Sequence, residues 1–136
     1  AVVGTPNRLE YDQGFFVKGG DGLADVKPIA HLYKPQGYQL ADALGVPEGI
    51  TRRAPTTATY SMERGQDEFY FSLPLVSMDR ALYAHEHGIG PEALAAELDL
   101  TVDEATRALR DIDRKRVATK YLHQAALLMD PGDGSG

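Results

Sequence analysis

The stretch FFVKGGDGLAD (residues 15–25), with Glu10 before it and Lys34 after it, gathers the side chains that a nucleotide triphosphate site needs. Its lysine and Lys34 offer compact positive charge for phosphates or carboxylates, whereas Glu10 and the two aspartates offer hard oxygen atoms for magnesium or ribose hydroxyls. Its three glycines allow the backbone to bend closely around a ligand. Each feature alone is common in ordinary loops, so the prediction of a site depends on their combination and order.

Upstream of this stretch, the sequence AVVGT (residues 1–5) is typical of a buried parallel strand that runs directly into a turn. A parallel strand needs neighbours on both sides, but the sequence downstream contains no second convincing strand. We therefore expect an α/β fold in which the rest of the sheet lies on residues upstream of Ala1.

Downstream patterns predict helices over 6–16, 34–45, 74–88 and 91–98, and a long helix from Thr101 to beyond Tyr121. Lys34 thereby lies at a helix N-terminus, where free backbone N–H groups and the helix dipole favour phosphate. Residues 18–28 are predicted to form a loop. We also expect a mobile loop over 52–66 that can close over a ligand, and a disordered tail over 130–136.

Apolar residues recur at helical spacing within these segments and indicate their buried faces. The predicted inward-facing residues are Leu9, Gln13 and Phe16 in the first helix, Leu75, Met78 and Leu82 in the third, and Val102, Ala105, Leu109 and Ile112 in the last. Thr101 and Glu104 have the spacing of a capping box, which predicts where the last helix begins.

Composition excludes several classes of function. The 136 residues are a common length for one domain, and 20 acidic against 14 basic side chains give a net charge of −6, which argues against a general nucleic-acid-binding role. The absence of cysteine excludes disulfides, zinc–thiolate sites and thiol nucleophiles. Because no apolar run approaches membrane-spanning length and no secretory signal is visible, we expect a cytoplasmic protein without a membrane partner.

Taken in order, a set of short motifs closely resembles the C-terminal half of NAD synthases. The set consists of Gly4-Thr5, Glu10, Phe15-Phe16-Val17-Lys18, Gly20-Asp21-Gly22, Ala24-Asp25, Pro28, Leu32, Lys34 and Pro55-Thr56. The resemblance assigns residues 1–129 to the C-terminal part of a NAD synthase domain. It implies the fold of the ATP pyrophosphatases (adenine nucleotide alpha hydrolase-like proteins), of which this chain would be the mostly helical half of a Rossmann-like parallel-sheet fold.

The resemblance also implies an enzyme that makes NAD from deamido-NAD, ATP and ammonia. In that family the nicotinate carboxylate attacks the α-phosphorus of ATP to give an acyl adenylate and pyrophosphate, and ammonia then attacks the activated carbonyl to release AMP. Magnesium and lysines would stabilise the charge on the leaving pyrophosphate. Members of the family are usually homodimers, and their ammonia is either taken up free or released from glutamine.

The same resemblance assigns roles to individual residues. ATP would be bound by Thr5, Lys34 and Thr56, Mg²⁺ by Glu10, and deamido-NAD by Lys18 and Asp25. Without the family resemblance, Glu10 would be interpreted as an ordinary surface glutamate of a helix, and Lys18 as a solvated lysine in a loop.

Near the C-terminus, Asp113-Arg114-Lys115 stands where the family has a Glu-His-Lys pattern that contacts the dinucleotide. Arg114 and Lys115 would then bind deamido-NAD, but an arginine is always charged and cannot transfer protons, so only a binding role remains. The alternative is that residues 114–116 form a solvated charge run on the outer face of the last helix.

One motif of the family is absent from the sequence. NAD synthases hold the ATP pyrophosphate with a Ser-Gly-Gly-x-Asp-Ser loop, and no such loop occurs here. In the family it precedes the part that this chain matches. We therefore expect the chain to be part of a longer protein and to be inactive alone.

Two alternatives remain. The first is an ATP-dependent amide ligase for another carboxylic acid, which would share the adenylation chemistry; Lys18 and Asp25 favour the dinucleotide instead. The second is a helix-turn-helix DNA-binding module over 89–124. Its supposed recognition helix would present acidic residues to phosphate, which argues against nucleic acid as a partner.

Overall fold

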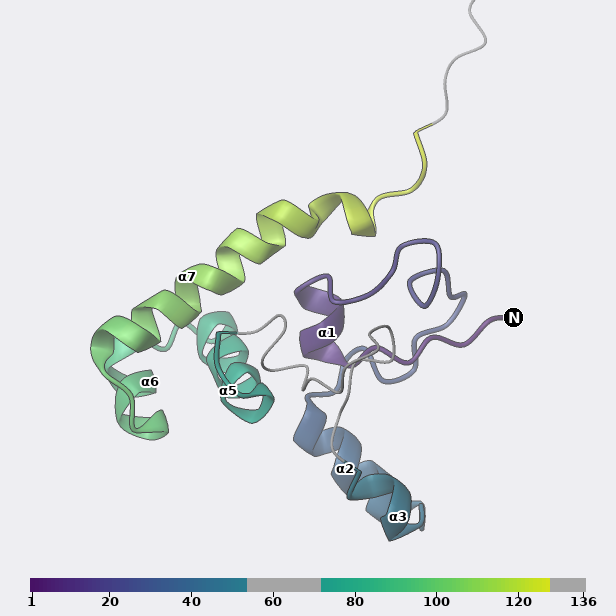
Figure 1. Cartoon of the computed structure of the whole chain (residues 1–136), viewed down its shortest axis with the longest axis horizontal. Helices are drawn as coiled ribbons and strands as arrows, with labels where there is room; N and C mark the ends of the chain where they lie inside the picture. The colour runs from purple at the N-terminus through teal and green to yellow at the C-terminus, as the bar shows by residue number, and fades with distance from the viewer. Residues whose placement is uncertain (54–71, 128–136) are drawn as a thin grey trace, which may run out of the picture.

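The computed structural model describes residues 1–53 and 72–127, and within these ranges the protein is mostly helical (Figure 1). Its elements are α1 (Arg8–Asp12), α2 (Lys34–Ala43), α3 (Glu48–Thr51), α5 (Leu75–Glu86), α6 (Pro91–Leu98), α7 (Val102–Thr119) and the 3₁₀ helix η1 (Lys120–His123). Thr56, most of the predicted loop over 52–66 and the tail over 130–136 lie outside the described residues. Within the described ranges, no helix has both the length and the apolar composition to cross a membrane.

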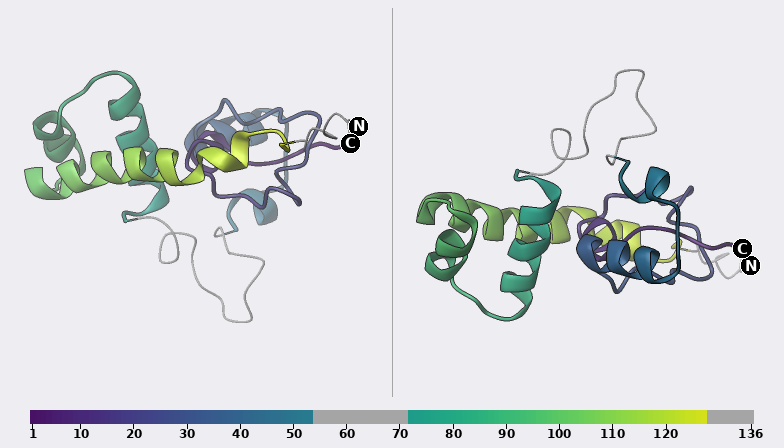
Figure 2. Two further views of the ribbon diagram at one scale, coloured as in Figure 1. Left: turned by 90° about the horizontal axis from the view of Figure 1, so that it is seen from above. Right: turned by 90° about the horizontal axis from the view of Figure 1, so that it is seen from below.

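Helix α5 is the central element. It packs against α1 and α2 on one side and against α6 and α7 on the other. Helix α7 is the longest at 18 residues, and it runs from α6 past α5 toward α1 and the glycine-rich loop (Figures 1 and 2). Segments from the two ends of the chain are therefore neighbours.

The N-terminal segment pairs with a partner that the sequence did not reveal. Val3 forms an isolated parallel bridge with Val26, in which the Gly4 N–H donates to the Val26 carbonyl oxygen at 2.8 Å and the Val26 N–H donates to the Val2 carbonyl oxygen at 3.2 Å. This bridge is a single pair and not a strand, so among the described residues it does not contradict the expectation of no second convincing strand downstream. Val26 follows a glycine-rich loop and lacks the apolar run that marks a strand. The larger parallel sheet stays a prediction.

The first helix, α1, is shorter than predicted. The Asn7 side-chain oxygen accepts a hydrogen bond from the Glu10 N–H, and the Glu10 carboxylate accepts one from the Asn7 N–H, each at 3.0 Å. This capping box begins the helix. The helix ends at Asp12 rather than near Phe16, because Gly14 adopts a left-handed conformation with φ of 69°.

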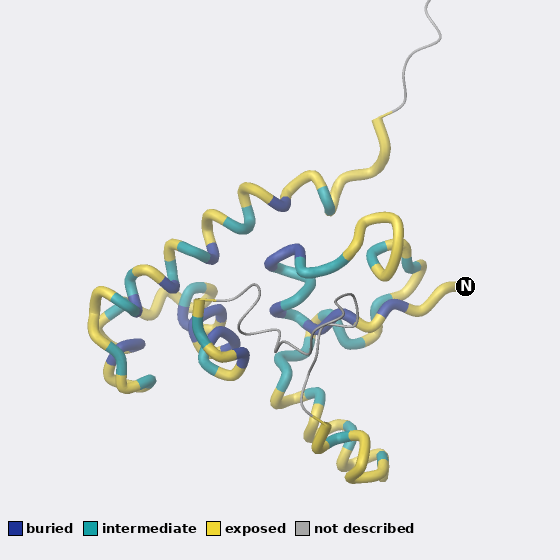
Figure 3. The backbone as a smooth tube through the Cα atoms, in the orientation of Figure 1, coloured by how far each residue is buried: buried dark blue, intermediate teal, exposed yellow. Residues whose placement is uncertain are grey.

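The hydrophobic core lies where α5, α6 and α7 meet and extends to Leu9 of α1 (Figure 3). The predicted inward positions of α5, Leu75, Met78 and Leu82, are all buried. On α7 the prediction was wrong for Val102, which is 45% exposed. Val102 is the first residue of that helix.

Helix α6 has the predicted bounds, and the predicted capping box at Thr101 and Glu104 begins α7. The end of α7 differs from the prediction, since the α-helix stops at Thr119 and the chain tightens into η1. Helix α2 begins at Lys34 as predicted and ends at Ala43, two residues before Gly45, whereas the short helix α3, which follows Pro47, was not predicted.

Two glycines with left-handed backbones offer a matched test of the packing between α1 and α7. A Cβ atom on Gly14 would lie 2.4 Å from the Thr119 Cβ, whereas a Cβ atom on Gly45, with φ of 71°, would meet nothing within 4 Å. Both Gly→Ala substitutions should cost about 1 kcal/mol for the backbone conformation. Gly14→Ala should lower the free energy of unfolding, measured by urea denaturation, by about 1–3 kcal/mol more than Gly45→Ala. Equal losses would contradict this close approach of α1 and α7.

Candidate functional site

Three of the predicted nucleotide-site residues line one cavity. Thr5, Glu10 and Lys34 border a cavity of about 250 Å³, here called the Lys34 pocket, whose other walls come from α2, α3 and the turn before α2. The Lys34 Nζ lies 3.5 Å from the Glu10 Oε1, and their side chains are 23% and 12% exposed. Glu10 is therefore not an ordinary surface glutamate, and the two opposite charges share a partly dry site.

Local structure explains how both charges reach this pocket. Glu10 is the third residue of α1, and its Oε2 accepts the Asn7 N–H while its Oε1 faces Lys34. Lys34 is the first residue of α2, as predicted. The Lys34 ammonium therefore borders the pocket close to the N-terminus of α2.

The donor set of the Lys34 pocket suits magnesium only with help from a ligand. No group of three or more His, Asp or Glu side chains that could hold a metal ion occurs among the described residues. Mg²⁺ commonly binds through one or two carboxylates together with substrate phosphates and waters. A single glutamate beside a lysine fits that mode of binding and does not fit a cage made of protein ligands alone.

Lys18 and Asp25 line a second cavity, of about 570 Å³, here called the loop pocket. The Lys18 Nζ donates to the Tyr121 carbonyl oxygen at 2.7 Å, and the Asp25 Oδ2 accepts the Val2 N–H at 2.7 Å. Residues that the sequence assigned to one substrate are thus brought into one pocket. The segment that follows α7, including His123, also lines this pocket.

The glycine-rich loop is folded on itself. The Val17 N–H donates to the Asp21 Oδ1 at 2.7 Å, and the Val17 carbonyl oxygen accepts the N–H groups of Gly20 and Gly22. A Cβ atom on Gly22 would lie 2.6 Å from the Phe16 ring, so only glycine fits there. Because several backbone N–H groups already have partners, this loop forms a wall of the pocket and is not an open phosphate cradle.

Arg114 and Lys115 lie on α7, apart from the residues that line the two pockets. The Lys115 Nζ pairs with Asp111 on the same helix at 2.6 Å, and its side chain is 14% exposed. Arg114 is exposed. Their predicted contact with a dinucleotide stays a prediction, as does the role of Thr56, which is outside the described residues.

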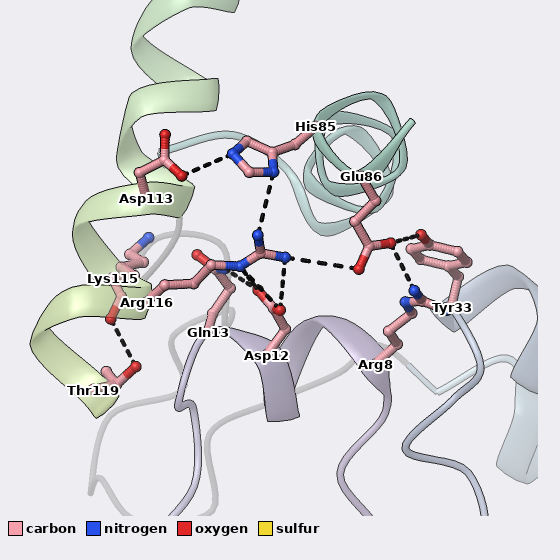
Figure 4. A network of polar contacts seen from close by, with 10 residues as sticks. All are labelled: Arg8, Asp12, Gln13, Tyr33, His85, Glu86, Asp113, Lys115, Arg116 and Thr119. Carbon is pink, nitrogen blue, oxygen red and sulfur yellow. Dashed lines mark hydrogen bonds and ion pairs between the residues drawn. The ribbon is translucent and has the colours of Figure 1, made fainter. Parts of the chain in front are cut away.

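A polar network that the sequence did not reveal centres on Arg116 (Figure 4). Its guanidinium forms a fork with the Asp12 carboxylate, with Nε donating to Oδ2 at 3.0 Å and Nη2 donating to Oδ1 at 2.8 Å. Its Nη1 lies 3.3 Å from the His85 Nδ1, and the His85 Nε2 lies 2.8 Å from the Asp113 Oδ1. Since arginine can only donate, this arrangement fits the His85 tautomer with its proton on Nε2.

Glu86 extends this network to the start of α2. Its Oε2 accepts from the Arg8 Nη2 at 2.8 Å and from the Tyr33 hydroxyl at 2.5 Å, and its Oε1 lies 3.7 Å from the Arg116 Nη2. Burial opposes ionisation of Glu86, but the hydrogen bonds from Tyr33 and Arg8 outweigh it and hold the pKa of Glu86 below its usual range. Burial and the bond to Glu86 raise the pKa of Tyr33, so its phenol stays protonated.

Asp79, also on α5, is the most deeply buried carboxylate that the structure describes, at 3% exposure. Its Oδ2 accepts the backbone N–H of Lys34 at 2.8 Å. Burial raises the pKa of Asp79 to about 6, although the bond from the Lys34 N–H and the Lys34 charge oppose the shift. The sequence gave no sign of this contact, because Asp79 and Lys34 are far apart along the chain.

Comparison with known proteins identifies the family of this chain. The family model described as NAD synthase matches residues 1–121. The chain is 59% identical over 131 residues to the NH(3)-dependent NAD(+) synthetase of Rhizobium rhizogenes, covering 96% of this chain and 40% of the relative. It is likewise 59% identical over 128 residues to the enzyme of that name from Mesorhizobium japonicum, covering 94% of this chain and 40% of the relative.

Among solved structures, the chain is similar in fold to NMN synthetase from Francisella tularensis. The TM-score is 0.67 and the sequence identity 24%, over 94% of this chain and 46% of that one.

The chain spans about 40% of the length of the two curated NAD(+) synthetases described above.

The Arg116 fork can be tested by a substitution that keeps the charge. Arg116→Lys should lower the free energy of unfolding by about 1–2 kcal/mol, because a lysine cannot form the two parallel bonds to Asp12. The same substitution at the exposed Arg114 should change it by less than about 0.5 kcal/mol. Urea denaturation of both variants makes the comparison. If Arg116→Lys and Arg114→Lys changed the free energy of unfolding equally, the fork would contribute no more stability than an exposed surface charge.

The raised pKa of Asp79 predicts a pH dependence of stability. The ordinary pKa is 3.8 and the folded value about 6, so between these values the folded protein binds more protons than the unfolded chain. Its contribution to stability therefore falls as pH rises through this window. Asp79→Asn has no carboxyl group at this position, so its free energy of unfolding lacks this pH dependence. From pH 4 to pH 7 the wild type should lose about 1–3 kcal/mol of unfolding free energy relative to the variant. Parallel pH profiles for the two proteins would contradict this.

Proposed function

Since the chain belongs to the NAD synthase family, we propose that the protein makes NAD from deamido-NAD, ATP and ammonia. The observation that supports this best is the sorting of the predicted residues into two pockets. Thr5, Glu10 and Lys34 line the Lys34 pocket, whereas Lys18 and Asp25 line the loop pocket. A reaction between a nucleotide triphosphate and a second large substrate needs two such sets of ligands.

In the first step, an oxygen of the nicotinate carboxylate attacks the α-phosphorus of ATP, and the bond from that phosphorus to the bridging oxygen of pyrophosphate breaks. The Lys34 ammonium and the N-terminus of α2 stabilise the charge that collects on the phosphates. When bound with ATP, Mg²⁺ neutralises phosphate charge, and Glu10 is the residue that would hold it. The Thr5 hydroxyl can donate to the nucleotide.

In the second step, ammonia attacks the carbonyl carbon of the acyl adenylate, loses a proton, and expels AMP as the carbon–oxygen bond breaks. The charge of Lys18 suits the phosphates of deamido-NAD, and Asp25 suits its hydroxyls. Water must be excluded while the adenylate waits for ammonia, because hydrolysis would return the acid. The relatives are named as ammonia-dependent enzymes, and we extend that nitrogen source to this protein.

The rest of the site is proposed to lie on the part of the family sequence that this chain does not span. That part would supply the Ser-Gly-Gly-x-Asp-Ser loop for pyrophosphate and the remaining strands of a Rossmann-like sheet, to which the segment around Val3 would belong. Residues 1–129 would form the C-terminal part of the synthase domain. Arg114, Lys115 and Thr56 would complete the ligand contacts in a cytoplasmic homodimer.

The proposal predicts the products of a defined assay. Full-length protein given ATP, Mg²⁺, deamido-NAD and ammonia should form NAD and AMP in equal amounts, whereas glutamine in place of ammonia should not support the reaction. Lys34→Ala should lower kcat/KM for ATP by about 100-fold, since it removes a charged phosphate ligand. Lys120→Ala, which changes an exposed lysine outside the two pockets, is the control.

Several outcomes would count against this proposal. Folded full-length protein that forms no NAD would remove it, and faster amidation of another carboxylic acid would favour the alternative ligase. If Lys34→Ala were as active as Lys120→Ala, the phosphate-binding role of Lys34 would be wrong.

A further inference from the structure

The local cap at the start of helix α2 is incomplete, although the Gln36 Oε1 accepts the Tyr33 N–H at 3.0 Å. The residue before it, Tyr33, makes no side-chain hydrogen bond to the first turn. Helix starts leave free backbone N–H groups that need partners, and a short polar side chain at the capping position usually provides one. Pro35 removes one of these donors because proline has no N–H. The Lys34 N–H is left as a donor that must find a partner elsewhere.

Asp79 provides that partner from another helix. Its Oδ2 accepts the Lys34 N–H at 2.8 Å, and the side chain is 3% exposed. Its other oxygen, Oδ1, is buried and has no hydrogen-bond partner among the described residues. Burying a carboxylate with one oxygen unsatisfied costs stability. A neutral or apolar residue would cost less, so the retained carboxylate suggests a role besides packing.

The contact with Asp79 is one of two that hold Lys34. The other joins the Lys34 Nζ to the Glu10 Oε1 at 3.5 Å. The main chain of Lys34 is thus attached to α5 and its side chain to α1. A lysine side chain has many rotamers, so an ammonium is placed accurately only if both its backbone and its charged end are held.

The residue before Lys34 is attached to the same helix. The Tyr33 hydroxyl donates to the Glu86 Oε2 (Figure 4). Glu86 lies two helical turns after Asp79 along α5, a spacing that puts the two residues on the same face of the helix. One face of α5 therefore carries two carboxylates that hold consecutive residues. This double attachment sets both the position and the direction of the start of α2.

We propose that Asp79 is a positioning residue for ATP: by binding the Lys34 N–H from the core, it places the Lys34 ammonium against the nucleotide phosphates. This inference rests on the proposed function. Asp79 itself need not touch any substrate. It acts through Lys34, and Glu10 completes the placement from the opposite side.

Steady-state kinetics of the full-length protein test this role. In Asp79→Leu the acceptor is lost, and KM for ATP should rise by about 10-fold or more, while KM for deamido-NAD stays within about twofold. In Asp79→Asn an oxygen acceptor remains, and KM for ATP should stay within about threefold of wild type. If the leucine variant does not fold, Asp79→Ala makes the same comparison with only atoms removed.

A double variant separates action through Lys34 from a general loss of structure. If Asp79 acts through Lys34, then adding Asp79→Leu to Lys34→Ala should leave KM for ATP at the value of Lys34→Ala alone. Met78→Ala, a truncation at the adjacent buried position, is the matched control. It should lower the melting temperature without changing KM for ATP.

The positioning role would be overturned if the effects of Asp79→Leu and Lys34→Ala on KM for ATP were additive, or if Asp79→Leu raised both KM values equally. It would also be overturned if Asp79→Asn and Asp79→Leu behaved alike. These results differ from failure of the proposed function, in which wild-type protein forms no NAD. An active wild type that is sensitive to Lys34→Ala but not to Asp79→Leu would leave the function intact and remove this inference alone.

Discussion

The fork between Arg116 and Asp12 is the interaction on which the arrangement of this protein most depends. It joins α7 to α1 across most of the chain, with charge-assisted bonds of 2.8 Å and 3.0 Å in a partly buried setting. Such forks specify orientation as well as distance, because the planar guanidinium must lie in the plane of the carboxylate. The close approach of Thr119 to Gly14 strengthens the same junction, since any side chain on that glycine would separate the two elements.

The junction matters because α1 has only five residues and cannot hold its orientation alone. Its consecutive residues point to different neighbours, as the helical rotation requires. Glu10 faces Lys34, Tyr11 borders the loop pocket, and Asp12 meets Arg116. A rotation of α1 that broke the fork would therefore disturb both pockets together. Helix α5 holds the other side of the Lys34 pocket through Asp79, so the pocket is built between two attached helices.

Local sequence signals predicted the helices well. The bounds of α6, the capping box before α7 and the buried face of α5 were all confirmed. Errors occurred where a distant contact overrode a local pattern. Gly14, with its left-handed backbone, stops α1 early at the point where Thr119 of α7 lies against it, and Val26 forms a bridge with Val3 although its own neighbourhood does not resemble a strand. The alternative of a solvated charge run over 114–116 does not hold for Arg116, and nothing near it in sequence indicates that Asp12 is its partner.

The sequence by itself determined the family, the helices, and which residue types could bind phosphate, metal and dinucleotide, because caps, periodicity and motif order are local properties of the chain. Only the tertiary structure decided how those residues are grouped. It brought Glu10 and Lys34 together, placed Lys18 with Asp25, left Lys115 paired with Asp111, and put Asp79 beneath the start of α2. Such groupings depend on backbone donors and carboxylates that are far apart in sequence, and they arise only when burial forces each polar group to find a partner.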